Sequence, residues 1–133
     1  MAKLDDVQRA FVRDNPFTAV LTTLRADGSP HSTVIWLDEE NGDIVFNTAR
    51  GRTKERNLAR DPRASVLMAD PANQYRWLAV SGRVALTTEG ADEQIDALAR
   101  KYTGSDYAMR REGELRVRAR LAPERIQALG LAD

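Results

Sequence analysis

The chain has 133 residues, 42% of them hydrophobic, which is enough for one domain with a hydrophobic core and too little for two comfortable ones. Twenty basic and twenty acidic residues cancel, which argues against a general nucleic-acid binder with a strongly basic surface. The lack of cysteine excludes disulfides, thiolate metal sites and cysteine nucleophiles, and a single histidine leaves few options for a histidine-based metal site, so we predict none.

The sequence offers no candidate membrane segment. No apolar run approaches the roughly 20 residues that a membrane helix needs. The first residues, MAKLDDVQRA, are polar and acidic, unlike a signal peptide. We therefore expect one cytoplasmic domain, 1–133, without a membrane span.

The first third of the chain predicts a helix and a hairpin. Apolar residues recur at helical spacing from Leu4 to Val12, and Pro16 stops the helix soon afterwards. Two β-branched, apolar segments follow, at 17–24 and 30–37, with turn residues between them. Their order indicates two antiparallel strands.

The middle of the chain continues this meander. A turn at 39–43 contains Asn-Gly and leads into a strand at 44–48. A helix opens at 53 and ends before Pro62. The nearly continuous apolar run at 64–69 predicts a strand that is buried on both faces.

The last third contains the longest predicted strand, 75–88, which Gly82 interrupts with a bulge or a sharp bend. A helix is expected at 89–102 and a cleanly alternating strand at 115–121. Pro123 then starts a short helical tail through residue 129.

Together these elements predict a mainly β (β + α) fold, an antiparallel barrel of six to seven strands with small flanking helices. The large apolar side chains, including Trp36 and Trp77, exceed what one small core readily covers. We therefore expect a symmetric homodimer.

The most informative segment is 47–63, because it predicts an anion-binding site. A strand ends at Asn47 and Thr48, a Gly-containing loop follows, and a helix opens at Thr53. Helix N-terminal N–H groups favour an anion, and Arg52 and Lys54 add charged donors. The alternative is a solvated helix face, but cations at a helix start are disfavoured unless an anion binds, and a purely structural helix would carry acids there. We predict a phosphate site.

Four segments, in this order, resemble the pyridoxamine 5′-phosphate oxidase-like split-barrel flavoproteins. They are AVLTTLRADGSPHSTVIW (19–36), IVFNTARGRTKERNLARDPRASV (44–66), YRWLAVSGRVAL (75–86) and RLAPERI (120–126). Within that superfamily, 52–58 and 61–65 resemble the small actinobacterial deazaflavin-dependent reductases, including those that reduce biliverdin. The resemblance spans nearly the whole chain and implies a homodimer of split barrels with two cofactor sites at the subunit interface.

The resemblance also implies three groups of cofactor-binding residues. The phosphate group is Asn47, Thr48, Arg52, Thr53 and Lys54. The strand that runs along the tricyclic ring, with backbone groups bonding the ring edge, carries His31, Ser32, Val34 and Trp36. The group expected from the partner subunit is Tyr75, Arg76 and Trp77.

Several of these residues have simpler explanations, which the sequence leaves open. Trp36 and Trp77 could be aromatics of the barrel or dimer core, and His31 could be a surface or hydrogen-bonded residue rather than a proton donor. A cationic stripe on the last strand is either a solvated face or a contact for an acidic cofactor tail; it consists of Arg116, Arg118 and Arg120. We identify no catalytic side chain.

The implied cofactor is coenzyme F-420, an 8-hydroxy-5-deazaflavin, or else FMN. True pyridoxamine phosphate oxidases carry C-terminal residues around a Trp that help to hold the substrate, whereas no Trp follows Trp77 here. We therefore expect an F-420-dependent oxidoreductase that transfers a hydride from the reduced cofactor to an electron-poor small organic substrate. The alternatives are an FMN-binding oxidoreductase and a non-catalytic deazaflavin carrier.

Overall fold

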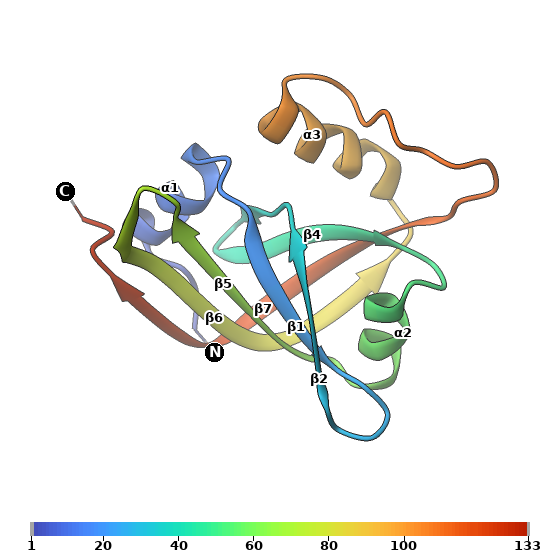
Figure 1. The fold of residues 1–133 in the computed structure, drawn as a ribbon, viewed down its shortest axis with the longest axis horizontal. Coiled ribbons are helices and arrows are strands. Elements are labelled where there is room, and N and C mark those ends of the chain that lie inside the picture. The colour runs from blue at the N-terminus through green and yellow to red at the C-terminus, as the bar shows by residue number, and fades with distance from the viewer. Residues whose placement is uncertain (1, 133) are drawn as a thin grey trace.

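The computed structural model describes residues 2–132, which form seven strands and three helices (Figure 1). The strands are β1 Ala19–Leu24, β2 Pro30–Ile35, β3 Asp38–Glu40, β4 Asp43–Ala49, β5 Arg63–Asp70, β6 Asn73–Thr87 and β7 Arg116–Leu129. The helices are α1 Asp6–Asp14, α2 Thr53–Arg60 and α3 Ala91–Thr103. The predicted mainly β fold with small flanking helices is confirmed.

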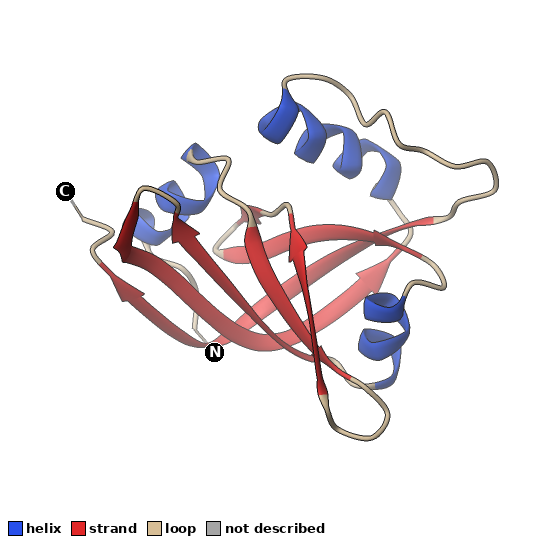
Figure 2. Ribbon diagram, viewed as in Figure 1, coloured by secondary structure: helices blue, strands red, loops and turns tan. Residues whose placement is uncertain are grey.

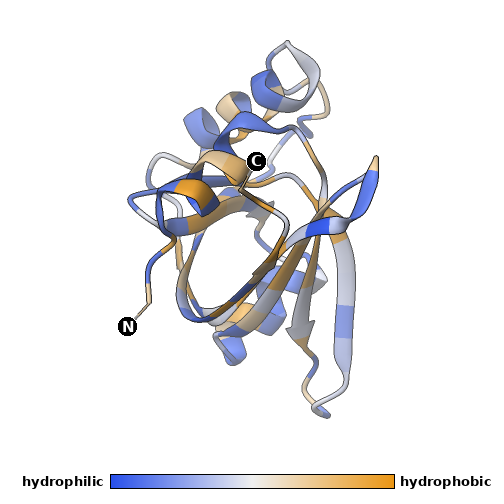
Figure 3. Ribbon diagram, turned by 90° about the vertical axis from the view of Figure 1, so that its left-hand side faces the viewer, coloured by the Kyte–Doolittle hydropathy of each residue, from blue (hydrophilic) through white to orange (hydrophobic). Residues whose placement is uncertain are grey.

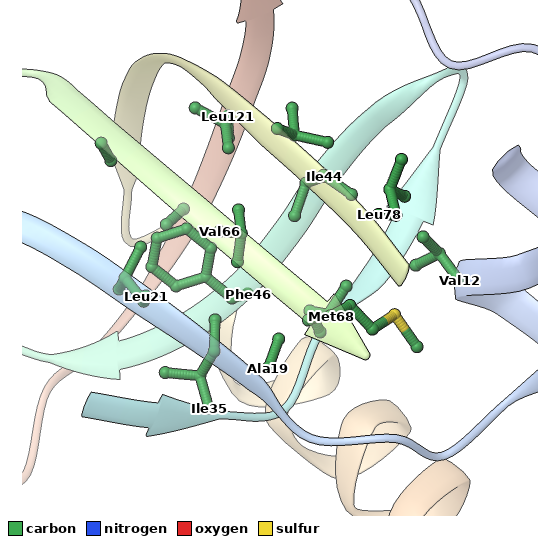
Figure 4. Close-up of a cluster of buried hydrophobic side chains, with 14 of the residues drawn as sticks. Val12, Ala19, Leu21, Ile35, Ile44, Phe46, Val66, Met68, Leu78 and Leu121 are labelled. Carbon is green, nitrogen blue, oxygen red and sulfur yellow. The ribbon is translucent and has the colours of Figure 1, made fainter. Parts of the chain in front are cut away.

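All neighbouring strands pair antiparallel, in the order β2-β1-β5-β6-β7-β4-β3. The strands curve around a common centre (Figure 3), where apolar side chains from several strands pack against one another (Figure 4). Phe46, Leu21 and Leu121 are at most 1% exposed there. The sheet does not close, because β2 and β3 remain as its two edges. The barrel is therefore split.

The helices lie outside this curved sheet (Figure 2). A capping box fixes the start of α1, where Asp5 Oδ1 accepts from the Gln8 N–H at 2.8 Å and Gln8 Oε1 accepts from the Asp5 N–H at 2.9 Å. Helix α2 contacts β1, β4 and β6, and α3 contacts β4 and β7. None of the helices within 2–132 is long and apolar enough to cross a membrane.

A short strand, β3, occupies part of the segment that the sequence assigned to a turn. It pairs with β4 through the two-residue connection Asn41-Gly42, whose φ angles are 54° and 85°. Positive φ at both central residues is the type I′ arrangement that Asn-Gly favours. The turn prediction was correct in kind but too long.

The predicted burial of 64–69 on both faces is wrong. Strand β5 alternates between buried and exposed residues, and Leu67 is 46% exposed on its outer side. A continuous apolar run does not by itself distinguish a doubly covered strand from one whose outer face is uncovered.

The predicted helical tail at 123–129 is also wrong, because β7 continues through it as far as Leu129. Pairing with β4 ends at Leu121, whereas pairing with β6 goes on. Beyond that point β7 has one unpaired edge, where a Pro without an N–H is tolerated. A partner strand that is distant in sequence thus overrides the local helical pattern.

The bulge that Gly82 predicted is confirmed. The register between β6 and β7 shifts between Ser81 and Gly82. A Cβ atom on Gly82 would lie 2.0 Å from the carbonyl oxygen of Ala122, a backbone atom that cannot rotate away. The two longest strands can approach each other this closely only because the residue is Gly.

We expect Gly82→Ala to destabilise the fold by about 3 kcal/mol, since the added methyl forces the β6–β7 pair apart. Urea unfolding monitored by circular dichroism measures this loss. Ser81→Ala, at the adjacent position without that contact, should change stability by no more than about 0.5 kcal/mol. Equal losses in the two variants would contradict the close-approach explanation.

Candidate functional site

A cleft of about 240 Å³ lies between the end of β2, the start of α2, helix α3 and the segment that leads into β7. Five of the residues that the sequence assigned to cofactor binding line it: Val34, Trp36, Asn47, Arg52 and Lys54. They come from three separate parts of the chain, and the fold brings them to one place.

The start of α2 provides two of the cations in this cleft. Arg52 is the N-cap residue, and its side chain makes no capping hydrogen bond. Lys54 is half-buried, and its pKa is lowered, first by burial and then by the charges of Arg52 and Arg116. A group that is surrounded by cations in this way favours a bound anion, which would stabilise its charged form.

The first turn of α2 also contains an acid, Glu55, of the kind expected in a purely structural helix. The Glu55 carboxylate is buried and accepts a hydrogen bond from the Gly51 N–H at 2.8 Å. It also lines a different hollow, together with Leu58 and Val84. Glu55 therefore orders the loop before the helix and does not line the cleft that Arg52 and Lys54 line.

Strand β7 contributes a third cation, Arg116, which is only 5% exposed. Its Nε donates to Asn47 Oδ1 at 2.9 Å. The Asn47 amide in turn donates to the Ala91 carbonyl and to Gln94 Oε1, both at 2.8 Å. Both amide protons are used within the fold, so Asn47 acts here by positioning Arg116 against α3.

The interpretation of the β7 arginines as a solvated stripe is wrong. Arg116 is buried in the cleft wall. Arg118 donates to Glu40, and Arg120 donates to Glu40 and, at 2.9 Å, to Asp43 Oδ2. Because side chains alternate along a strand, the three arginines lie on one face of β7. Acids on β3 and β4 neutralise Arg118 and Arg120 but not Arg116.

The apolar wall of the cleft is aromatic. The Trp36 ring stacks on Tyr102 with centroids 5.5 Å apart and meets Tyr107 edge-on at 6.4 Å. Tyr102 is itself fixed, because its hydroxyl donates to the Phe17 carbonyl at 2.7 Å. Burial raises the pKa of Tyr102 to about 12, so it remains a neutral donor. A flat apolar surface thus lies beside a group of cations.

Strand β2 forms one edge of the sheet, so the outer row of its backbone N–H and C=O groups has no strand partner. Ser32 is hydrogen-bonded to Thr22 across the β1–β2 pair at 2.9 Å. His31 Nδ1 and Thr33 Oγ1 are buried and have no hydrogen-bond partner among the described residues. His31 and Ser32 lie earlier on β2 than Val34 and Ile35, the two residues of this strand that line the cleft.

The structure does not bring two of the predicted phosphate residues into the cleft. Thr48 is 2% exposed, and strand alternation points it to the opposite face of β4 from Asn47. Thr53 is exposed at the first position of α2 but does not line the cleft.

The segment Tyr75–Trp77 lies at the β5–β6 end of the sheet, far from α2 along the long axis of the molecule (Figure 1). Arg76 donates to Asp70 at 3.1 Å and stacks over the Phe11 ring at 4.8 Å. Within one subunit these residues cannot contact a ligand in the cleft.

Sequence reasoning missed part of the cleft. Ile95 and Leu98 line it from α3, where the helical pattern had identified only an apolar face. Tyr107 and Met109 cover it from the segment that follows α3. That segment has no periodic pattern, so nothing in the sequence indicated that it folds over the cations.

Comparison with known proteins shows the family of the chain. A family model described as pyridoxamine 5′-phosphate oxidase matches residues 4–130. An F420H(2)-dependent biliverdin reductase from Mycobacterium tuberculosis (strain CDC 1551 / Oshkosh) is 33% identical over 135 residues, covering 98% of this chain and 90% of the relative.

Two solved structures share the fold. An F420 reductase has a TM-score of 0.79 at 24% identity, covering 89% of this chain and 94% of its own. A conserved hypothetical protein from Mycobacterium tuberculosis has a TM-score of 0.75 at 25% identity, and the match covers 96% of this chain and 86% of that protein. Because the family model matches almost from end to end, this chain belongs to the pyridoxamine 5′-phosphate oxidase family.

Proposed function

We propose that this protein is a coenzyme F-420-dependent reductase that delivers a hydride to an electron-poor small organic substrate. The observation that carries the proposal is the convergence of Arg52, Lys54 and Arg116 on one cleft beside the Trp36 ring. The relative at 33% identity, which is named for its dependence on F420H(2), supports the choice of cofactor.

The donor set fits the phosphate of such a cofactor. Two guanidinium groups and one ammonium offer charge-assisted hydrogen bonds, and the guanidinium groups match phosphate oxygens in pairs. Burial, and after it the charges of the two arginines, lower the pKa of Lys54, so the cleft disfavours a further positive charge. A phosphate would relieve that repulsion.

The rest of the cleft fits a flat aromatic group. The Trp36 ring is held against Tyr102, and β2 offers unpaired backbone groups along its free edge. When bound, the reduced deazaflavin supplies the hydride. The chain itself binds the phosphate, orients the ring and keeps water from one side of it.

We also propose that the protein acts as a homodimer whose interface is the outer face of β2, β1, β5, β6 and β7. Val34, Val20 and Leu67 form a row across this face and are 66%, 39% and 46% exposed. Trp77 lies on the same side, paired with Leu129 of β7. A second copy on this face would cover the apolar row and would bring Tyr75 and Trp77 to the neighbouring cleft.

Changing Arg52 or Lys54 to Ala should remove a charge-assisted interaction with the phosphate of about 1.5–3 kcal/mol, which lowers F-420 affinity roughly tenfold to a hundredfold. Stability without ligand should hardly fall, because a cation at a helix start opposes the helix dipole. Isothermal titration with F-420, and separately with FMN, measures the affinities.

The matched control is Arg60→Ala, at the other end of α2, which should leave affinity unchanged. Tight FMN binding without F-420 binding would assign the protein to FMN, and binding without turnover of any screened substrate would indicate a carrier. Unchanged affinity in both Arg52→Ala and Lys54→Ala would remove the basis of the proposal.

Phosphate affinity should depend on the protonation of Lys54. Burial and the neighbouring arginines lower its pKa below the usual 10.5, whereas a bound anion favours the charged ammonium. Affinity should therefore be constant around neutral pH and decrease as the pH rises through this lowered pKa. Titrations across the alkaline range test this: Arg52→Ala should keep the decrease and Lys54→Ala should lose it.

Leu67→Arg should dissociate the proposed dimer, because it places a charge in the middle of the apolar row. F-420 affinity should then fall although the cations of the cleft are intact. Sedimentation equilibrium and titration measure the two effects. Val7→Arg is the matched control, since Val7 is also 46% exposed but lies on α1. A monomeric Leu67→Arg variant with undiminished affinity would contradict the interface.

A further inference from the structure

The cations of the cleft already share an internal partner, the carboxylate of Glu114. Its Oε1 accepts from Arg116 Nη1 at 2.5 Å, and its Oε2 lies 3.6 Å from Arg52 Nη2. The side chain is 9% exposed. One carboxylate therefore connects the N-cap of α2 with the buried arginine of β7.

Electrostatics favour this position for Glu114. Burial by itself would raise the pKa of the carboxyl, but the hydrogen bond from Arg116 and the charges of Arg116 and Arg52 lower it overall. The group is thus ionised near neutral pH. Glu114 thus neutralises only part of the positive charge of Arg52, Lys54 and Arg116, but it already occupies donors of the two arginines.

Glu114 belongs to a segment, 105–115, that covers the cleft mainly through side chains. Tyr107 meets Trp36 edge-on, and the Arg116 guanidinium lies 5.1 Å from the centre of the Tyr107 ring. Arg110 forms ion pairs with Asp92 and Asp96 on α3 at 3.0 and 2.8 Å. The Arg110 ion pairs are partly exposed and are broken at low cost. The backbone of the segment is held at two points, where the Tyr107 N–H donates to Asp96 Oδ1 at 3.0 Å and the Leu115 carbonyl accepts from the Arg50 N–H at 2.9 Å.

The segment also has suitable points at which to bend. Gly104 precedes it with φ of 83°, and Gly113 lies directly before Glu114 with φ of 76°. Neither position has a neighbouring atom within 4 Å of where a Cβ would be, so packing does not hold the backbone there.

We propose that Glu114 is an internal competitor for the phosphate site: a phosphate-bearing cofactor binds by displacing its carboxylate from Arg52 and Arg116, which moves the 105–115 segment off the cleft. The inference rests on the proposed function, because it assumes that these cations hold a phosphate. Its consequence is that Glu114 sets the affinity of the site, since each ligand must replace the internal ion pair.

The test is Glu114→Gln, which removes the charge but keeps an oxygen that can accept from Arg116. The probes are inorganic phosphate and F-420, titrated calorimetrically into the full chain. The variant should bind both about tenfold more tightly than the unaltered protein, which corresponds to the loss of one competing ion pair. Glu112→Gln is the control, because it removes an equal charge from an exposed position two residues away.

Affinity of Glu114→Gln that is equal to or below that of the unaltered protein would overturn the inference. If Arg52→Ala and Lys54→Ala still weaken binding in that case, the proposed function stands and only the competitor role fails. If they do not, the phosphate site itself fails.

A second measurement reports displacement directly. Saturating phosphate should shift the NMR signals of the Tyr107 ring, assigned with Tyr107→Phe, because the ring leaves Trp36 and Arg116. Unchanged Tyr107 signals at saturation would contradict displacement even if the affinities change.

Discussion

Repulsion among three cations is the constraint on which the rest of the site depends. Arg52, Lys54 and Arg116 line a cleft that is partly shielded from water, where like charges interact more strongly than on an open surface. The cost is visible at Lys54, whose pKa is lowered by burial and then by the two arginines. Glu114 offsets part of this repulsion, and the remaining excess of positive charge favours a bound anion.

The surrounding structure holds this arrangement in place. Asn47 uses its amide oxygen for Arg116 and both amide protons for α3, so one side chain connects β4, β7 and the helix that covers them. The acids Glu40 and Asp43 neutralise Arg118 and Arg120, which confines the excess of positive charge to the cleft. Pairing with β4, which sets Ala49 opposite Arg116, fixes where Arg116 lies. Pairing with β6, made possible at Gly82, holds the rest of β7 from Arg118 onwards.

The open barrel separates two kinds of surface. The free edge of β2 and the start of α2 border the cleft, while the outer face of β1, β5 and β6 carries exposed apolar residues such as Leu67. A closed barrel would leave no strand edge beside the cations. Residues 75–77 lie on β6 near the β5–β6 turn, at the other end of the sheet from α2 (Figure 1).

Local sequence determined most of the fold and part of the site. The Asn-Gly turn, the bulge at Gly82 and the helix that begins at Thr53 each depend on the backbone preferences of a few adjacent residues, so they could be predicted. Arg52 and Lys54 were identified for the same reason, because both lie at a helix start that the sequence marks. Family resemblance added the expected positions on β2.

Tertiary structure decided the rest. Residues 123–129 form a strand because they pair with β6, which is distant in the sequence: Ile126, for example, lies opposite Val80. Arg116 is buried, rather than solvated like a residue of an exposed stripe, because α3 and Asn47 cover it. Glu114 reaches the cations only because the segment after α3 folds back over the cleft. Each of these outcomes depends on which distant groups meet, and the pairing of distant groups is set by the packing of the whole chain rather than by the preferences of neighbouring residues.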